Sequence, residues 1–149
     1  MSHIVVFYVV QIAACWFALR CGGMPERLVA VALVAAAIAT SVLSAMSPRV
    51  YHTVETFLIV DIALLILMMA IAAVANRFWP IWLSALHLVA IAVHGVKAYD
   101  PSLVPWIYAG AVTKMAYPII ALLVIGTERH RRRRASYGGD PDWSAPQTR

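Results

Sequence analysis

Five apolar stretches, each near the length of a membrane-crossing helix, most constrain what this chain can fold into. A transmembrane helix needs about 20 mostly apolar residues, and about 17–25 is the usual range. The five stretches cover residues 4–19, 28–46, 54–75, 79–98 and 104–125, and the first of them is the shortest. They predict an all-α fold, namely a polytopic transmembrane helical bundle of five spans.

The composition agrees with this interpretation. The 149 residues are 62% hydrophobic and 13% charged, whereas soluble domains average about 45–50% apolar and about 25% charged residues. A soluble domain of this size buries only about 70% of the surface of its unfolded chain. Because so many apolar side chains exceed what such a core can hold, we expect lipid to cover them. The predicted location is a membrane, specifically the bacterial cytoplasmic (inner) membrane, as a multi-pass protein.

Helix-breaking segments separate the stretches, and their sequences are CGGMPER, SPRVYH, NRFWP and YDPS. Pro48 and Pro101 disfavour helical geometry in the residues before them, whereas Pro80 lies near the start of a stretch, where a missing N–H costs little. We therefore expect one transmembrane domain over residues 1–126. Residues 127–149 lack an apolar period and are rich in Gly, Pro and Ser, so we expect a polybasic, disordered cytoplasmic tail.

The arginines predict the orientation of the chain. The block RHRRRR at 129–134 directly follows the last stretch, and such clusters stay on the cytoplasmic side. With five spans, Arg20, Arg27 and Arg77 fall on the same side, so the N-terminus is outside and the C-terminus inside. Because the basic excess is concentrated in the tail, we expect membrane lipids as its partner and no nucleic acid. The arginines expected to contact lipid head groups are Arg129, Arg131, Arg132, Arg133 and Arg134.

The first stretch has an alternative interpretation as a lipoprotein signal peptide, because residues 12–15 read IAAC. The residues before it contain no Lys or Arg, which the leading region of a signal peptide carries. Its removal would leave four spans and place the arginine block outside, against the positive-inside rule. We therefore expect the first stretch to be retained.

The second stretch carries a face of small residues. Ala32, Ala36, Thr40 and Ser44 recur every four positions, and small residues at this spacing let helices approach closely in lipid. This face predicts either packing inside one bundle or contact with another membrane-protein subunit. The sequence leaves both open.

Several ionisable residues fall within the stretches. A charge at the bilayer centre costs about 2.5–3.5 kcal/mol on insertion scales, so each needs a partner. At about 1.5 Å of rise per residue, Asp61 and Lys114 both lie in the outer half, and their side chains lean outward. We therefore expect Lys114 to pair with Asp61. His87, His94 and Glu55 complete the predicted intramembrane polar site.

Pro118 adds a further element to this site. It lies four residues after Lys114 and cannot donate the helical hydrogen bond to the Lys114 carbonyl. That carbonyl is then free for water or a ligand, and Gly110 leaves space one turn away. The alternative is a simple kink, since Pro and Gly are common in membrane helices.

The two histidines do not predict a metal site. His87 and His94 are seven residues apart, which is about 10 Å along one helix, too far to share an ion. A b-type haem needs axial ligands from both sides of its ring, and no second histidine is well placed. We expect no bound cofactor, with haem on one of these histidines as the alternative.

Function is less constrained than fold. No Walker loop, Rossmann fingerprint, HExxH, GxSxG or CxxC motif occurs, so we assign no catalytic residue and do not expect an enzyme. The favoured interpretation is a non-catalytic accessory or assembly subunit of a membrane complex. One alternative is a proton- or small-solute-handling protein that uses Asp61 and Lys114 with His87 and His94. A membrane redox protein with haem or quinone is the third.

Overall fold

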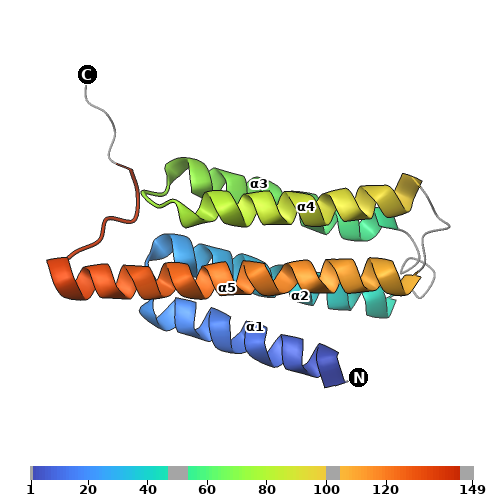
Figure 1. Cartoon of the computed structure of the whole chain (residues 1–149), viewed down its shortest axis with the longest axis horizontal. Coiled ribbons are helices and arrows are strands. Elements are labelled where there is room, and N and C mark those ends of the chain that lie inside the picture. Colours follow the sequence, from blue (N-terminus) through green and yellow to red (C-terminus); the bar gives the residue numbers. More distant parts are fainter. Residues whose placement is uncertain (1, 47–53, 100–104, 145–149) are drawn as a thin grey trace.

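The computed structural model describes residues 2–46, 54–99 and 105–144 (Figure 1). These residues form helices and no β-strand beyond one isolated bridge between Ala75 and Trp143. The first helix ends before Gly22 and Gly23, and the last ends before Gly138, because glycine favours turns over helix interiors. The five helices are α1 (Ser2–Cys21), α2 (Met24–Met46), α3 (Val54–Val74), α4 (Trp79–Tyr99) and α5 (Pro105–Tyr137). The predicted all-α fold with five helices is confirmed.

The helices pack in chain order around a closed ring. Each contacts the next, α5 returns to α1, and α2 also contacts α5. Figure 1 shows the helices running roughly along one axis, with the C-terminal end of α5 extending beyond its neighbours. Within the described residues the backbones of α3 and α5 do not approach each other closely, and α4 packs against both. This order decides which side chains can meet.

The core runs along the inside of this ring. Side chains from all five helices are buried there, with Ala18, Val29, Met68, Leu83 and Leu123 fully inaccessible to solvent.

The small-residue face of α2 contributes to this core. Ala32 is buried within it, Ala36 packs against it, and Thr40 is half-buried. The side chain of Ser44 lies outside the described residues. Ala32 and Ala36 therefore contribute to packing inside the chain, and contact of this face with another subunit stays a prediction.

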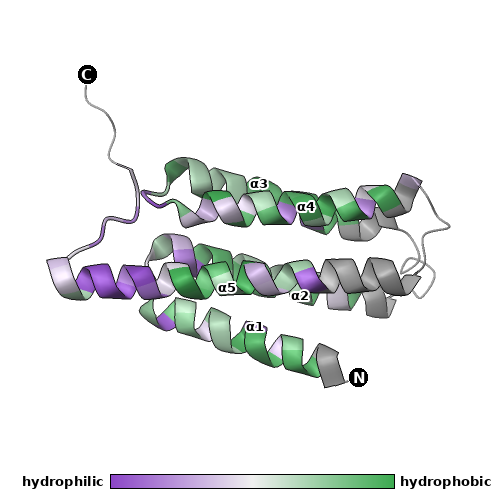
Figure 2. Cartoon of the chain, in the orientation of Figure 1, coloured by the Kyte–Doolittle hydropathy of each residue, from purple (hydrophilic) through white to green (hydrophobic). Residues whose placement is uncertain are grey.

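Two helices are long and apolar enough to cross a membrane, over Met24–Leu43 and Trp79–Val96. Shorter apolar segments occupy Val5–Cys21 in α1 and Leu58–Val74 in α3. Figure 2 shows apolar residues along the described parts of all helices and a polar end at the close of α5. These lengths give weak support for membrane association, and the five-span arrangement stays a prediction.

The C-terminal region differs from the expected disordered tail. Helix α5 continues through Pro118 and past residue 126 to Tyr137. It ends where Gly138 adopts a positive φ of 72° and its N–H donates to the Arg134 carbonyl, as in helices closed by a left-handed glycine. The chain then returns over the α3–α4 loop, where the Ser144 N–H donates to the Val74 carbonyl at 2.9 Å. Local arginine pairs and this docking order a segment that composition alone marks as loose.

Candidate functional site

A carboxylate and two imidazoles meet between α3 and α4. Helix α3 carries Asp61, and α4 carries His87 and His94 two turns apart on one face. His94 Nε2 lies 3.0 Å from Asp61 Oδ2. His87 Nε2 donates to the Asp61 backbone carbonyl at 3.0 Å and lies 3.8 Å from Oδ1. One acidic residue thus serves both histidines, and we call these three the Asp61 cluster.

The Asp61 cluster borders a small cavity of about 130 Å³. Both histidines are 5% exposed, and Asp61 is half-buried. Gln11 of α1 reaches the cavity from the opposite side, and its Nε2 donates to the Leu33 carbonyl at 3.2 Å. Its Oε1 is buried and has no hydrogen-bond partner among the described residues. The remaining lining is apolar and includes Phe7, Leu64, Ala90, Ala116, Ile119 and Ile120.

Lys114 does not take the position predicted for it. Its side chain is exposed, and the ion pairs of the described residues join Asp61 to His94 and His87 but not to Lys114. The physical reason is the order of helices in the ring, since α4 separates α3 from α5. The histidines of the intervening helix reach Asp61 first. The expected Asp61–Lys114 pair is therefore replaced by an Asp61–histidine cluster.

Two further residues of the predicted polar site stay apart from the Asp61 cluster. Pro118 is exposed on α5, and its neighbours Ile119 and Ile120 line the cavity instead. The side chain of Glu55 lies outside the described residues, although its backbone begins α3.

The Asp61 cluster has the composition of a proton-binding site. Asp and His side chains recur together in the proton relays of membrane proteins. A haem does not fit, because about 130 Å³ lies below the roughly 300–1,000 Å³ of typical ligand pockets. The arrangement can therefore hold a proton or a few waters beside Asp61.

A second polar cluster surrounds Arg77 in the α3–α4 loop, and no sequence pattern pointed to it. The Arg77 side chain is fully buried. Its Nη1 contacts Glu26 at 2.9 Å and Asp140 at 3.1 Å, and its Nη2 contacts Asp142 at 2.8 Å. One guanidinium thus joins α2, the α3–α4 loop and the segment after α5.

Glu26 is the most deeply buried acid of this cluster, with 0% exposure. Besides Arg77, it accepts hydrogen bonds from Trp79 Nε1 at 3.1 Å and from the Gly23 N–H at 3.0 Å. Its position in the first turn of α2 also places the negative charge at the positive end of the helix dipole. A buried charge of this kind is tolerated because every partner is present.

The segment after α5 closes the cluster. Asp140 lies 2.7 Å from His130 Nδ1 and 3.2 Å from Arg133 Nε. The Asn76 N–H donates to the Asp142 carbonyl at 3.2 Å. A side chain at Gly23 would collide with the Asp142 carboxylate, so glycine is needed there. We call the whole set the Arg77 cluster, and its members are Glu26, Arg77, Trp79, His130, Arg133, Asp140 and Asp142.

Part of the Arg77 cluster resembles a metal site in its donor atoms. Glu26, His130 and Asp142 each place one ligand atom within 4.8 Å of the others. However, Arg77 already binds Glu26 Oε1 and Asp142 Oδ1. The guanidinium thus satisfies the oxygens that a cation would need, and the group acts as an ion-pair network.

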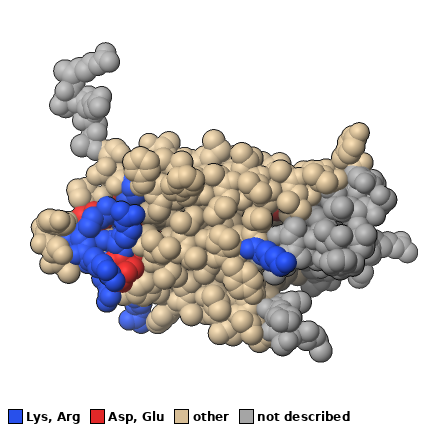
Figure 3. Space-filling view, viewed as in Figure 1, with Lys and Arg blue, Asp and Glu red and all other residues tan. Residues whose placement is uncertain are grey.

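Four of the five arginines of α5 divide into two sets, and Arg134 lines a separate cavity beside Gly22 and Gly23. Arg131 and Arg132 both bond Glu128, at 2.8 and 2.7 Å. These hydrogen bonds, from Arg131 first and then Arg132, lower the pKa of the exposed Glu128 to about 2. Arg129 and Arg133 instead line a cavity beside the α3–α4 loop. Figure 3 shows most of the basic side chains gathered at the end of the molecule where α5 ends, with one basic side chain apart from them.

An apolar core separates the two clusters along the helices. Met68, Leu83 and Leu123 fill it and are fully buried. The buried hydroxyls of Ser84 and Thr127 donate to carbonyls of their own helices.

Comparison of the chain with protein-family models, with curated proteins and with solved structures finds no match.

Proposed function

We propose that this chain is a multi-pass protein of the bacterial cytoplasmic membrane that binds a proton at the Asp61 cluster. The membrane part is supported by side chains that face outward. In the two helices of spanning length, only 22% and 33% of the apolar window is buried, whereas a soluble core helix is mostly buried. Contiguous exposed apolar surface marks contact with lipid or partners. Every helix presents such residues, among them Ile12, Ile38, Ile66, Trp82 and Ile125.

The proposed orientation places the N-terminus outside. The arginines of α5 gather at one end (Figure 3), together with the buried Arg77, and such charges stay cytoplasmic. Asp61 is in the half of α3 farther from that end. The Asp61 cluster then lies in the outer half of the membrane.

The observation that carries the proton-binding function is the 3.0 Å contact between Asp61 Oδ2 and His94 Nε2. An ionisable group inside a bilayer is costly and marks a functional site by default. A proton shared by the two side chains removes most of that cost, and its loss leaves a carboxylate beside a neutral imidazole. His87 holds the Asp61 backbone at 3.0 Å and so keeps the acid in place.

The described core offers no polar route from this site toward the Arg77 cluster. Between the Asp61 cluster and the Arg77 cluster, the described core is apolar, and its hydroxyls are engaged within their own helices. A chain of polar groups would be needed to carry protons across it. The proposal is therefore proton-linked binding, or a route that a partner completes, rather than a stand-alone channel.

Proton uptake after a pH jump tests the proposal. The full chain in lipid nanodiscs is moved between mildly acidic and mildly alkaline buffer, and a soluble dye counts the protons exchanged. We expect Asp61→Asn and His94→Gln each to exchange fewer protons than the wild type, and by the same amount. Lys114→Met is the matched control, because Lys114 is exposed and outside the ion pairs of Asp61. Equal uptake by the wild type and both site variants, with unchanged helicity, would refute the proposal.

The accessory or assembly-subunit function stays a prediction. Its sequence argument was the small-residue face of α2, and Ala32 and Ala36 of that face belong to the core of this chain. A partner recovered in stoichiometric amount after mild-detergent purification would support it on independent grounds.

A further inference from the structure

We propose that the cavity between α5 and the α3–α4 loop binds one anionic phospholipid. Its phosphate would meet Arg129 and Arg133, and an acyl chain would follow the adjoining groove between α3 and α4. This inference rests on the proposed membrane location and is independent of the Asp61 cluster.

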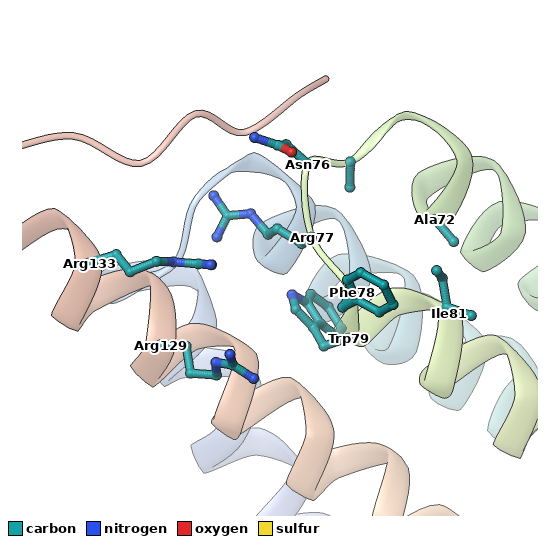
Figure 4. Close-up of a pocket in the computed structure, with 9 residues that line it drawn as sticks. Ala72, Asn76, Arg77, Phe78, Trp79, Ile81, Arg129 and Arg133 are labelled. Carbon is teal, nitrogen blue, oxygen red and sulfur yellow. The ribbon is translucent and has the colours of Figure 1, made fainter. Parts of the chain in front are cut away.

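The polar half of the site is a cavity of about 360 Å³, within the range of about 300–1,000 Å³ for small-molecule pockets. Arg129 and Arg133 are one turn apart on α5 and so project from the same face. Figure 4 shows both reaching from α5 toward the loop segment that carries Arg77 and Trp79. Asn76 borders the same space.

The arginines around the cavity differ in whether neighbouring carboxylates already neutralise their charge. Arg77 is neutralised by the carboxylates of its cluster, yet its Nε is buried without a hydrogen-bond partner among the described residues. Arg133 Nε likewise lacks a hydrogen bond there, although Asp140 lies 3.2 Å away. Within the described part of the chain, the Arg129 side chain takes part in no ion pair or hydrogen bond, and the residue is exposed. Arg129 is thus the cation available to an anionic ligand.

The apolar half of the site is a groove of about 410 Å³ between α3 and α4. Ala72 and Ile81 border both the cavity and the groove, so the two adjoin there. The groove runs from there to Leu65 on α3 and Leu88 on α4, roughly 10 Å at about 1.5 Å per residue. Its lining is almost entirely apolar, which fits an acyl chain.

The position of the site agrees with this ligand. Phe78 is 79% exposed and Trp82 64% exposed beside it, and exposed aromatic side chains favour the head-group level of a bilayer. Basic pockets on the cytoplasmic side bind anionic head groups. A free phosphate would use the arginines but leave the groove empty, whereas a phospholipid fills both halves.

Lipid retention by the detergent-purified full chain tests the polar half. The probes are phosphatidylglycerol and phosphatidylcholine, and native mass spectrometry measures the fraction of chains that hold one lipid. We expect a clear preference for phosphatidylglycerol. Arg129→Gln should weaken it by about tenfold or more, because a charge-assisted hydrogen bond is lost. Arg132→Gln is the matched control. Arg132 lies three residues after Arg129 and already pairs with Glu128, so its loss should weaken phosphatidylglycerol retention by about fivefold or less.

The groove is tested by a bulky side chain at its junction with the cavity. Ala72→Trp should abolish phosphatidylglycerol retention, whereas Ala70→Trp, at an exposed position of α3 outside the groove, should leave it unchanged. Excess inorganic phosphate should not displace the lipid. Equal effects of the two arginine changes would indicate diffuse surface charge and overturn the proposal. Displacement by phosphate, or full retention in Ala72→Trp, would do the same.

These outcomes are separable from those of the proposed function. Asp61→Asn should leave phosphatidylglycerol retention unchanged, so loss of proton uptake says nothing against the lipid site. Release of the wild-type chain from membranes by alkaline extraction would contradict the proposed membrane location, and it would therefore also contradict the phospholipid proposal.

Discussion

Replacement of Arg77 by Met should test how far the buried ion pairs hold the fold together. The change removes a fully buried guanidinium that contacts Glu26 at 2.9 Å. Glu26, with 0% exposure, would keep only two neutral donors, the Trp79 indole and the Gly23 N–H. Breaking a buried pair by removing one partner costs about 3–5 kcal/mol. That is a large part of the roughly 5–15 kcal/mol by which domains are stable.

The other acids of the cluster should add little to this cost. Asp140 keeps its contacts with His130 and Arg133, and the Asp142 side chain is 28% exposed, so water can replace the lost partner. Most of the loss is therefore assigned to the uncompensated charge of Glu26. If so, adding Glu26→Gln to Arg77→Met should recover part of the lost stability, because the amide is neutral and its single oxygen can still accept the hydrogen bond of either Trp79 or Gly23.

The assay is unfolding in mixed micelles of increasing denaturing-detergent content, followed by tryptophan fluorescence. Arg132→Met is the control, since among the described residues this exposed arginine forms its ion pair with Glu128, and exposed pairs contribute about 0–1 kcal/mol. The reasoning fails if Arg77→Met costs no more than Arg132→Met. It also fails if the double variant is as unstable as the sum of its single changes, because the buried pair would then show no coupling.

Further outcomes follow from other contacts. Gly126→Ala should destabilise the same unfolding transition by about 1–3 kcal/mol, because its new Cβ would lie 2.8 Å from the Trp79 ring. The Glu128 carboxyl, with a pKa lowered from 4.5 to about 2, should stay ionised in NMR titrations until well below pH 4. Its contribution to helix stability is present above about pH 4.5 and lost as the pH falls through about 2. In liposomes, the full chain alone should carry no proton flux, because the core between the two clusters is apolar. A flux that is lost in Asp61→Asn and kept in Lys114→Met would contradict this expectation.

Local patterns were sufficient for the helices. The apolar stretch at 79–98 appears as Trp79–Tyr99, and the one at 54–75 as Val54–Val74. Helix bounds follow the length of an apolar run and the Gly and Pro residues around it, and both are properties of neighbouring residues. The end of α5 was missed because the order of residues 127–144 depends on partners elsewhere in the chain. The arginine-rich helix is held by Glu128 and by the returning segment at Asp140.

The candidate site shows the same division. Hydropathy alone marked Asp61, His87 and His94 as exceptional, because a polar group in an apolar helix stands out wherever the helix packs. Their grouping without Lys114 depended on the ring order, in which α4 separates α3 from α5.

The sequence by itself determined which segments are helical, which of their residues are polar against an apolar background, and where basic charge accumulates. Only the tertiary structure decided which side chains form ion pairs with each other. It set Arg77 against Glu26, 51 positions away, and Asp61 against the histidines of the next helix. The reason is physical: helix formation depends on contacts within a few residues, whereas ion pairing needs atoms within about 4 Å, and packing alone brings distant segments that close.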